Sequence, residues 1–113
     1  MKVIIAGGRN FEDYEVVKKA IEESGYLITE VVSGKAPGVD SLGERWAKEN
    51  NIPIIPFPAD WSTYDRAAGP IRNQKMADYS DTLVAVWDGV SRGTKDMVRR
   101  MKKMNKDVHI KYV

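Results

Sequence analysis

The stretch "TLVAVWDGVSRGT", Thr82 to Thr94, joins an apolar run to a turn of small polar residues, and a helical pattern follows. The run is rich in β-branched residues and does not alternate, which indicates a strand of a parallel sheet that is covered on both faces. A turn of this kind before a helix often holds a phosphate, because the unpaired amides and the dipole at a helix N-terminus favour an anion. Strand, polar turn and helix together suggest both the fold class and a first candidate site.

The same alternation recurs along the chain. Short apolar runs cover residues 3–6, 30–33, 53–57, 82–87 and 107–113, and segments with helical spacing cover residues 14–21, 39–47, 67–79 and 97–104. This order predicts an α/β fold, a Rossmann-like doubly wound sheet of about five parallel strands in the order 3-2-1-4-5 with helices on both faces. Residues 58–70 are expected to form the longest irregular stretch, long enough for a functional loop.

Composition restricts the class of protein. The chain has 113 residues, which fits one domain over residues 1–113, and its net charge of +2 does not indicate a nucleic-acid binder. Cysteine is absent, which excludes disulfides and thiolate metal sites. No apolar run approaches the ~20 residues that cross a bilayer, so we expect no membrane association and a cytoplasmic location.

Ligands of doubly wound sheets bind beyond the carboxyl ends of the strands, where the strand order reverses. Here that point lies between the first and fourth strands, and the second strand is adjacent. Arg72 and Asn73 begin the helix predicted at 67–79, where a cation gains nothing from the dipole, so an anionic ligand would explain Arg72. The full set of candidate ligand-binding residues is Gly7, Gly8, Arg9, Asn10, Ser33, Gly34, Gly38, Asp40, Arg72, Asn73, Asp88, Ser91, Gly93 and Thr94.

Structural roles are the alternative for these residues. Gly7 and Gly8 suit a tight turn, Ser33, Asp40, Ser91 or Thr94 suits a helix cap, and Arg72 suits a solvated surface. Trp61, Tyr64 and Trp87 flank the same region, where they could stack on a base or pack in the core.

Several classes of site are disfavoured. "GGRNF", from Gly7, lacks the third glycine of a dinucleotide fingerprint, which argues against a nicotinamide dehydrogenase. His109 is the only histidine, so neither a metal cluster nor a Ser-His-Asp arrangement can be argued. We therefore expect no metal and no cofactor.

The chain resembles the SLOG superfamily, specifically its YspA/YpsA-related branch of bacteria and phages. The resemblance rests on "GGRNFED", "VSGKAPGVDSLGERWAKE", "PADW", "AAGPIRNQKMADYSD" and "VAVWDGVSRGT". Lys35 and Pro37 depart from the branch pattern, in which a glycine and an arginine are usual. The resemblance implies a homodimer or higher homo-oligomer, for which the methionines of the last helix and Tyr79 offer an apolar surface.

The superfamily also includes the Lonely-guy phosphoribohydrolases, which cleave nucleoside monophosphates. Their arginine-containing helix start looks like "GPIRNQKM", which implies a phosphate or ribose contact for Arg72. Their Gly-Thr-x-x-Glu loop looks like "GTKDM", which implies phosphate contacts for Gly93 and Thr94 but places Met97 at the catalytic Glu. Asp96 is one residue short, about 100° around the helix.

Three functions follow from these observations. The first is a binding protein or sensor for a nucleotide or nucleotide-derived small molecule, without turnover. The second is an N-glycosidase of nucleoside monophosphates that uses Asp40 or Asp88. The third is single-strand nucleic-acid binding, which the near-neutral charge disfavours.

Overall fold

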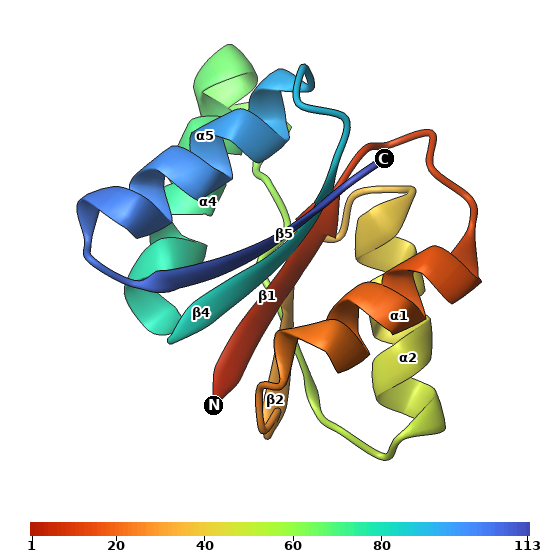
Figure 1. The fold of residues 1–113 in the computed structure, drawn as a ribbon. Coiled ribbons are helices and arrows are strands. Elements are labelled where there is room, and N and C mark those ends of the chain that lie inside the picture. Colours follow the sequence, from red (N-terminus) through yellow and green to blue (C-terminus); the bar gives the residue numbers. More distant parts are fainter.

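A five-stranded parallel sheet runs through the centre of the molecule in a computed structural model that describes residues 1–113 (Figure 1). Its strand order, β3-β2-β1-β4-β5, confirms the predicted doubly wound topology. β1 is central, and Ile4 pairs with Val32 of β2 on one side and with Leu83 of β4 on the other. The strands are β1 (Lys2–Gly7), β2 (Glu30–Ser33), β3 (Ile54–Pro56), β4 (Thr82–Trp87) and β5 (Asp107–Tyr112).

Helices cover both faces of the sheet, as predicted. α1 and α2 lie on one face, and α4 and α5 lie on the other (Figure 1). None of the helices is long and apolar enough to cross a membrane. The helices are α1 (Tyr14–Ser24), α2 (Val39–Glu49), α3 (Trp61–Tyr64), α4 (Ala68–Tyr79) and α5 (Arg92–Lys103), with a 3₁₀ turn, η1 (Asp65–Ala67), between α3 and α4.

Two apolar layers form the core, one on each face of the sheet. Side chains alternate along a strand, so Val3 and Ile5 of β1 pack beneath α1 and α2, whereas Ile4 packs beneath α4 and α5. α2 approaches β1 closely, because a Cβ on Gly43 would lie only 2.7 Å from the side chain of Ile5. This double burial explains why the strands read as continuous apolar runs.

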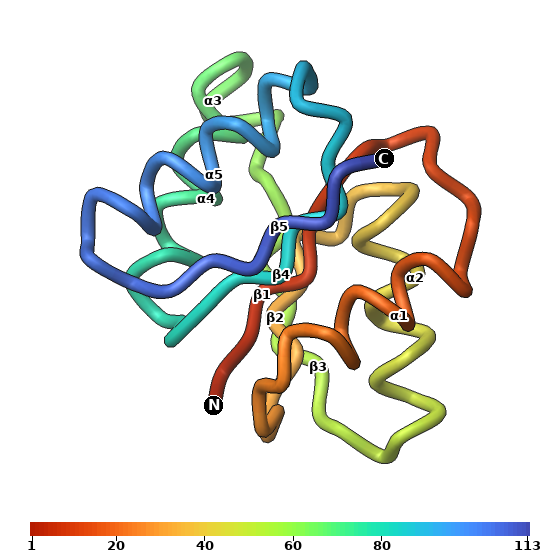
Figure 2. The backbone as a smooth tube through the Cα atoms, viewed as in Figure 1, coloured from red at the N-terminus to blue at the C-terminus, as the bar shows by residue number.

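The prediction of an irregular stretch at residues 58–70 was wrong. The chain there forms α3, η1 and the first residues of α4. Figure 2 shows α3 at the top of the view, above α4. Asp60 stabilises the start of α3, since its side chain accepts hydrogen bonds from the Thr63 amide and the Ser62 hydroxyl. α3 has no buried residue, so no apolar periodicity marks it in the sequence.

The prediction that the methionines of the last helix form an interaction surface was also wrong for Met97 and Met101. Both side chains are buried in the layer beneath α4 and α5, where helical spacing turns them toward the sheet. Tyr79 is partly buried against the same layer, and its hydroxyl donates a hydrogen bond to Glu30. Met104, at the end of α5, is exposed, and the other large exposed apolar side chains include Trp61, Tyr64, Leu27, Val90 and Tyr112.

Candidate ligand-binding pocket

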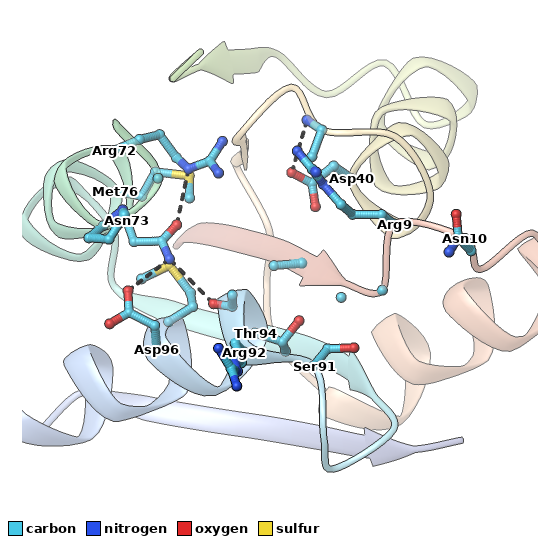
Figure 3. Close-up of a pocket in the computed structure, with 18 of the residues that line it drawn as sticks. Arg9, Asn10, Asp40, Arg72, Asn73, Met76, Ser91, Arg92, Thr94 and Asp96 are labelled. Carbon is cyan, nitrogen blue, oxygen red and sulfur yellow. Dashed lines mark hydrogen bonds between the residues drawn. The ribbon is translucent and has the colours of Figure 1, made fainter. Parts of the chain in front are cut away.

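A cavity of about 730 Å³ opens at the carboxyl ends of β1 and β4, the point at which the strand order reverses. Its volume lies within the range of about 300–1,000 Å³ that is usual for small-molecule sites. Figure 3 shows Arg9 and Asp40 on one side, Arg72, Asn73 and Asp96 on the other, and Ser91, Arg92 and Thr94 at the start of α5. The cavity therefore collects residues from five elements, β1, α2, α3, α4 and α5, and from the loops between them.

Most of the candidate residues predicted from the sequence line this cavity, and a few do not. Those that line it are Gly7, Gly8, Arg9, Asn10, Asp40, Arg72, Asn73, Ser91, Gly93 and Thr94. Those that lie outside the lining are Ser33, Gly34, Gly38 and Asp88.

The N-terminus of α5 presents free backbone amides. Asp88 folds the preceding turn, because its carboxylate accepts hydrogen bonds from the amides of Val90 (2.8 Å) and Ser91 (2.7 Å). The Ser91 side chain does not cap the helix but donates its hydroxyl to Asp88. Lys95 donates the first helical amide bond, to the Ser91 carbonyl at 3.1 Å. The amides of residues 92–94 come before this first helical bond and have no carbonyl partner in the helix, so they remain available to an anion.

Arg72 is held at the side of the cavity by two hydrogen bonds within the protein. Its Nη1 donates to the Gly34 carbonyl at 2.5 Å, and its Nε donates to Asn73 Oδ1 at 3.0 Å. Asn73 Nδ2 in turn donates to Asp96 Oδ2 at 3.0 Å and to the Gly93 carbonyl at 3.3 Å. Since a guanidinium has five N–H donors, this arrangement fixes Arg72 and still leaves donors for a ligand.

Positive charge exceeds negative charge around the cavity. Arg9, Arg72 and Arg92 line it, and Asp40 and Asp96 are the lining carboxylates. Asp96 is already neutralised by ion pairs with Arg99 and Arg100, which lie outside the lining. Burial opposes ionisation of Asp96, but hydrogen bonds from Arg100, Asn73 and Arg99 hold its pKa below the ordinary value.

The electrostatics of Arg72 follow from its burial. Burial lowers the pKa of its guanidinium, the negative charge of Asp40 opposes that effect, and the positive charge of Arg9 adds to it. An arginine remains protonated despite such shifts, so Arg72 is a partly desolvated cation beside the free amides of α5. Such a cation pairs more strongly with an anion than a solvated one does.

Asp40 is a buried carboxylate with a free oxygen. Its side chain lines the cavity although the residue is only 6% exposed. Oδ2 accepts a hydrogen bond from the Ala36 amide at 3.3 Å, the Gly34 amide also stabilises the charge of the carboxylate, and no hydrogen bond reaches Oδ1. Burial raises the pKa of Asp40 to about 6, against the lowering effects of the Ala36 amide and Arg72. No group of three His, Asp or Glu side chains is placed to hold a metal ion.

The predicted residues that lie outside the lining build the loops around it. Ser33 donates its hydroxyl to Glu44 at 2.6 Å, and Glu44 also pairs with Lys35 at 2.8 Å. A Cβ on Gly34 would lie 2.7 Å from Arg72 Nη1, so this glycine lets Arg72 reach the backbone of the β2 loop. Gly38 has a φ of +78°, and a Cβ there would lie 2.1 Å from the Gly8 carbonyl oxygen.

Lys35, which departs from the branch pattern, has a backbone conformation that glycine adopts more easily than lysine does. Its φ is +60°, in the left-handed region. The ion pair between its side chain and Glu44 fixes the loop, and Lys35 itself is exposed and lies outside the cavity lining. The departure therefore changes the loop after β2 without changing the cavity wall.

Some lining residues were not among the candidates. Trp61 lies at the cavity and is 51% exposed, which makes it the aromatic side chain that a ligand can reach. Trp87 instead stacks on Tyr112 with ring centroids 5.9 Å apart. Arg92 could have been found from the sequence, because it lies within "SRGT", the turn that was expected to hold a phosphate. Trp61 had been named only as a residue that could stack on a base, and the lining residues outside the candidate set are Ala6, Ala36, Trp61, Gly69, Pro70, Met76, Arg92, Asp96 and Met97.

The fold and the cavity define a Rossmann-like α/β domain with a candidate small-molecule pocket. The family YAcAr, described as the YspA, cpYpsA-related SLOG family, matches residues 1–64. The chain is also 31% identical to the Gene 61 protein of Mycobacterium phage D29 over 112 residues, which cover 90% of this chain and 89% of the phage protein. No solved structure matches the chain. The chain belongs to the YspA, cpYpsA-related SLOG family.

Asp40→Asn is expected to stabilise the ligand-free protein at pH 7.5. The raised pKa means that ionised Asp40 costs folding free energy, and two pKa units correspond to a gain of about 1–3 kcal/mol for the neutral amide. The folded state binds the proton more readily than the unfolded state. The difference between variant and wild type should therefore shrink as the pH falls through 6 and vanish below 3.8, the ordinary value.

Urea unfolding of both proteins between pH 4 and 8 measures this effect. Glu44→Gln is the matched control, because Glu44 is on the same helix but accepts hydrogen bonds from Ser33 and Lys35 that stabilise its charge. This control should be less stable than wild type at pH 7.5. A loss of stability in Asp40→Asn of the same size would show that the Asp40 carboxylate is satisfied within the protein.

Proposed function

We propose that this protein binds a nucleotide or nucleotide-derived small molecule in the cavity and acts as a sensor or binding protein without turnover. The phosphate lies against the amides of residues 92–94 and the free donors of Arg72, and Thr94 donates its hydroxyl. One observation carries the proposal: a helix N-terminus without a side-chain cap and a partly buried arginine line the same cavity.

Three further observations support a nucleotide as the ligand. Membership of the SLOG family suggests a nucleotide-derived ligand. The cavity of about 730 Å³ is large enough for a nucleoside monophosphate, and its excess of arginines suits an anion. Trp61 at the cavity offers an aromatic face on which a base can stack.

The residues around Met97 favour binding over hydrolysis. Cleavage of an N-glycosidic bond builds positive charge on the ribose, which a carboxylate stabilises and a thioether does not. Met97 lines the cavity at the position that corresponds to the catalytic Glu in the Lonely-guy resemblance. The neighbouring carboxylate, Asp96, is engaged by Arg99, Arg100 and Asn73 and has no free role in catalysis.

An N-glycosidase remains the alternative function, and Asp40 is the observation in its favour. Asp40 lines the cavity with an unpaired oxygen, and its pKa of about 6 suits a group that exchanges protons near neutral pH. Asp88, the other carboxylate considered for catalysis, does not line the cavity, and its carboxylate is occupied by Val90 and Ser91.

A cytoplasmic homodimer or higher homo-oligomer is the setting that we propose for this activity. The family resemblance supports self-association. The exposed side chains of Trp61, Tyr64, Val90 and Tyr112 supply apolar surface for it, in place of the buried methionines of α5.

Nucleoside monophosphates are expected to raise the melting temperature of the wild-type protein, because a ligand that binds only the folded state stabilises it by mass action. Arg72→Ala and Thr94→Val should each lose most of that shift, since the first removes the cation and the second removes the hydroxyl with little change in volume. The measurement is a thermal shift assay with AMP, GMP, CMP and UMP.

Arg99→Ala is the matched control for loss of an arginine, because Arg99 is exposed, pairs with Asp96 and does not line the cavity. It should respond to nucleotide as the wild type does. Equal responses of the wild type, Arg72→Ala and Thr94→Val would place the phosphate elsewhere on the protein.

Purified protein incubated with AMP, GMP, CMP or UMP should release no free base above the background rate, because Met97 cannot stabilise the developing charge. Chromatography of the reaction mixture measures base release. Turnover on the order of 1 per second would support the N-glycosidase instead, and the loss of that turnover in Asp40→Asn would identify the carboxylate responsible.

A further inference from the structure

Asp40 is a polar group of the cavity that phosphate binding does not use. Its Oδ2 is engaged by the Ala36 amide, whereas Oδ1 accepts no hydrogen bond from the protein. The residue is only 6% exposed, and what remains accessible belongs to the lining of the cavity. The oxygen that accepts no bond is accessible from the cavity, so a donor supplied by the ligand can complete the hydrogen bonds of this carboxylate.

We propose, on the basis of the proposed function, that Asp40 accepts a hydrogen bond from a ribose hydroxyl of the ligand and makes the protein selective for ribonucleotides over sugars that lack hydroxyls.

The surroundings of Asp40 favour a neutral donor over an ion. A metal ion would need further ligands, and no group of three His, Asp or Glu side chains is placed to hold one. Arg72 lies close by and influences the charge of Asp40, which disfavours a second cation at the same point. An anionic group of the ligand would be repelled by the carboxylate. A hydroxyl is neutral and donates one hydrogen bond, which is what Oδ1 lacks.

The distance to Arg72 assigns that hydroxyl to the sugar. Arg72 Nη1 and Asp40 Oδ2 lie 2.7 and 3.0 Å from one point, the position that a Cβ on Gly34 would occupy. These two atoms therefore lie near each other, although their side chains come from opposite sides of the cavity. If Arg72 binds the 5′-phosphate, the groups within reach of Asp40 belong to the adjoining ribose, because the polar edge of the base lies beyond the sugar ring.

The energetics of the site agree with this assignment. A hydrogen bond to a charged acceptor contributes more than a bond to a neutral one, and a ligand that covers the Asp40 oxygen without donating to it loses binding free energy. A site that is built to bond a hydroxyl therefore rejects the deoxy analogue strongly. Burial raises the pKa of Asp40 only to about 6, so the carboxylate is ionised at neutral pH and ready to accept the bond.

Isothermal titration of the wild-type protein with AMP, GMP, CMP and UMP and with their 2′,3′-dideoxy counterparts tests the proposal. Each pair carries the same base and the same phosphate, so the ratio of the two Kd values reports on the hydroxyls alone. We expect the dideoxy compound to bind at least about 10-fold more weakly than the ribonucleotide. The 2′-deoxy compounds then show which hydroxyl is recognised.

Asp40→Asn should reduce this ratio to below about 3-fold, since a neutral amide is a weaker acceptor. Glu44→Gln, which alters a carboxylate of the same helix outside the cavity lining, should keep the wild-type ratio. Wild-type ratios within about 2-fold of unity, or an unchanged ratio in Asp40→Asn, would overturn the ribose assignment while nucleotide binding stands. Absence of binding by every nucleotide would overturn the proposed function as well.

Discussion

The side chain of Asn73 connects the two helices that flank the cavity, and the geometry of the site depends on it. Asn73 is buried in α4, and its amide nitrogen donates to Asp96 and to the Gly93 carbonyl at the start of α5. Its amide oxygen accepts from Arg72, whose guanidinium also bonds the Gly34 carbonyl after β2. A buried amide with all these bonds made is costly to move, so α4, α5 and the β2 loop keep a fixed separation.

Asp40 and Asp96 show how the two carboxylates of one cavity differ in role. Asp96 has three partners that stabilise its charge, which makes it part of the framework. Asp40 has one backbone donor and a raised pKa, so its ionised form lowers the stability of the folded protein. A residue that reduces stability and faces a cavity is typical of a group that serves a ligand.

The sequence predicted the fold well because the strands are buried on both faces. The apolar run at residues 82–87 coincides with β4, and residues 30–33 coincide with β2, since double burial requires continuous β-branched residues. The glycines at the ends of β1 and β2 correctly indicated the edge of the sheet at which the cavity lies. Ser33 and Gly34 do not line the cavity, because the loop turns Ser33 toward Glu44 and uses the Gly34 carbonyl to hold Arg72.

Other features could not be predicted from sequence patterns. α3 has no buried face and therefore no periodicity, so the place of Trp61 at the cavity depends on how α3 packs against α4. The role of Asp96 depends on Asn73, which lies far away in sequence and approaches only because α4 and α5 are neighbours on the sheet. The resemblance to the Lonely-guy enzymes aligned Met97 with their catalytic Glu, but only the structure shows that Met97 lines the cavity.

The most direct test of the central claim is a ¹H–¹⁵N NMR titration of the wild-type protein with the ribonucleoside monophosphate that binds most tightly. If the phosphate lies at the start of α5, the largest amide shifts should fall on residues 92–94 and on Gly7 to Asn10, at the opposite side of the same cavity. A second hollow along α2 offers cations in a different place, and it is lined by Lys35, Ala36, Ser41, Glu44, Arg45, Lys48 and Glu49. Shifts confined to that surface, with the amides of residues 92–94 unchanged, would contradict the claim.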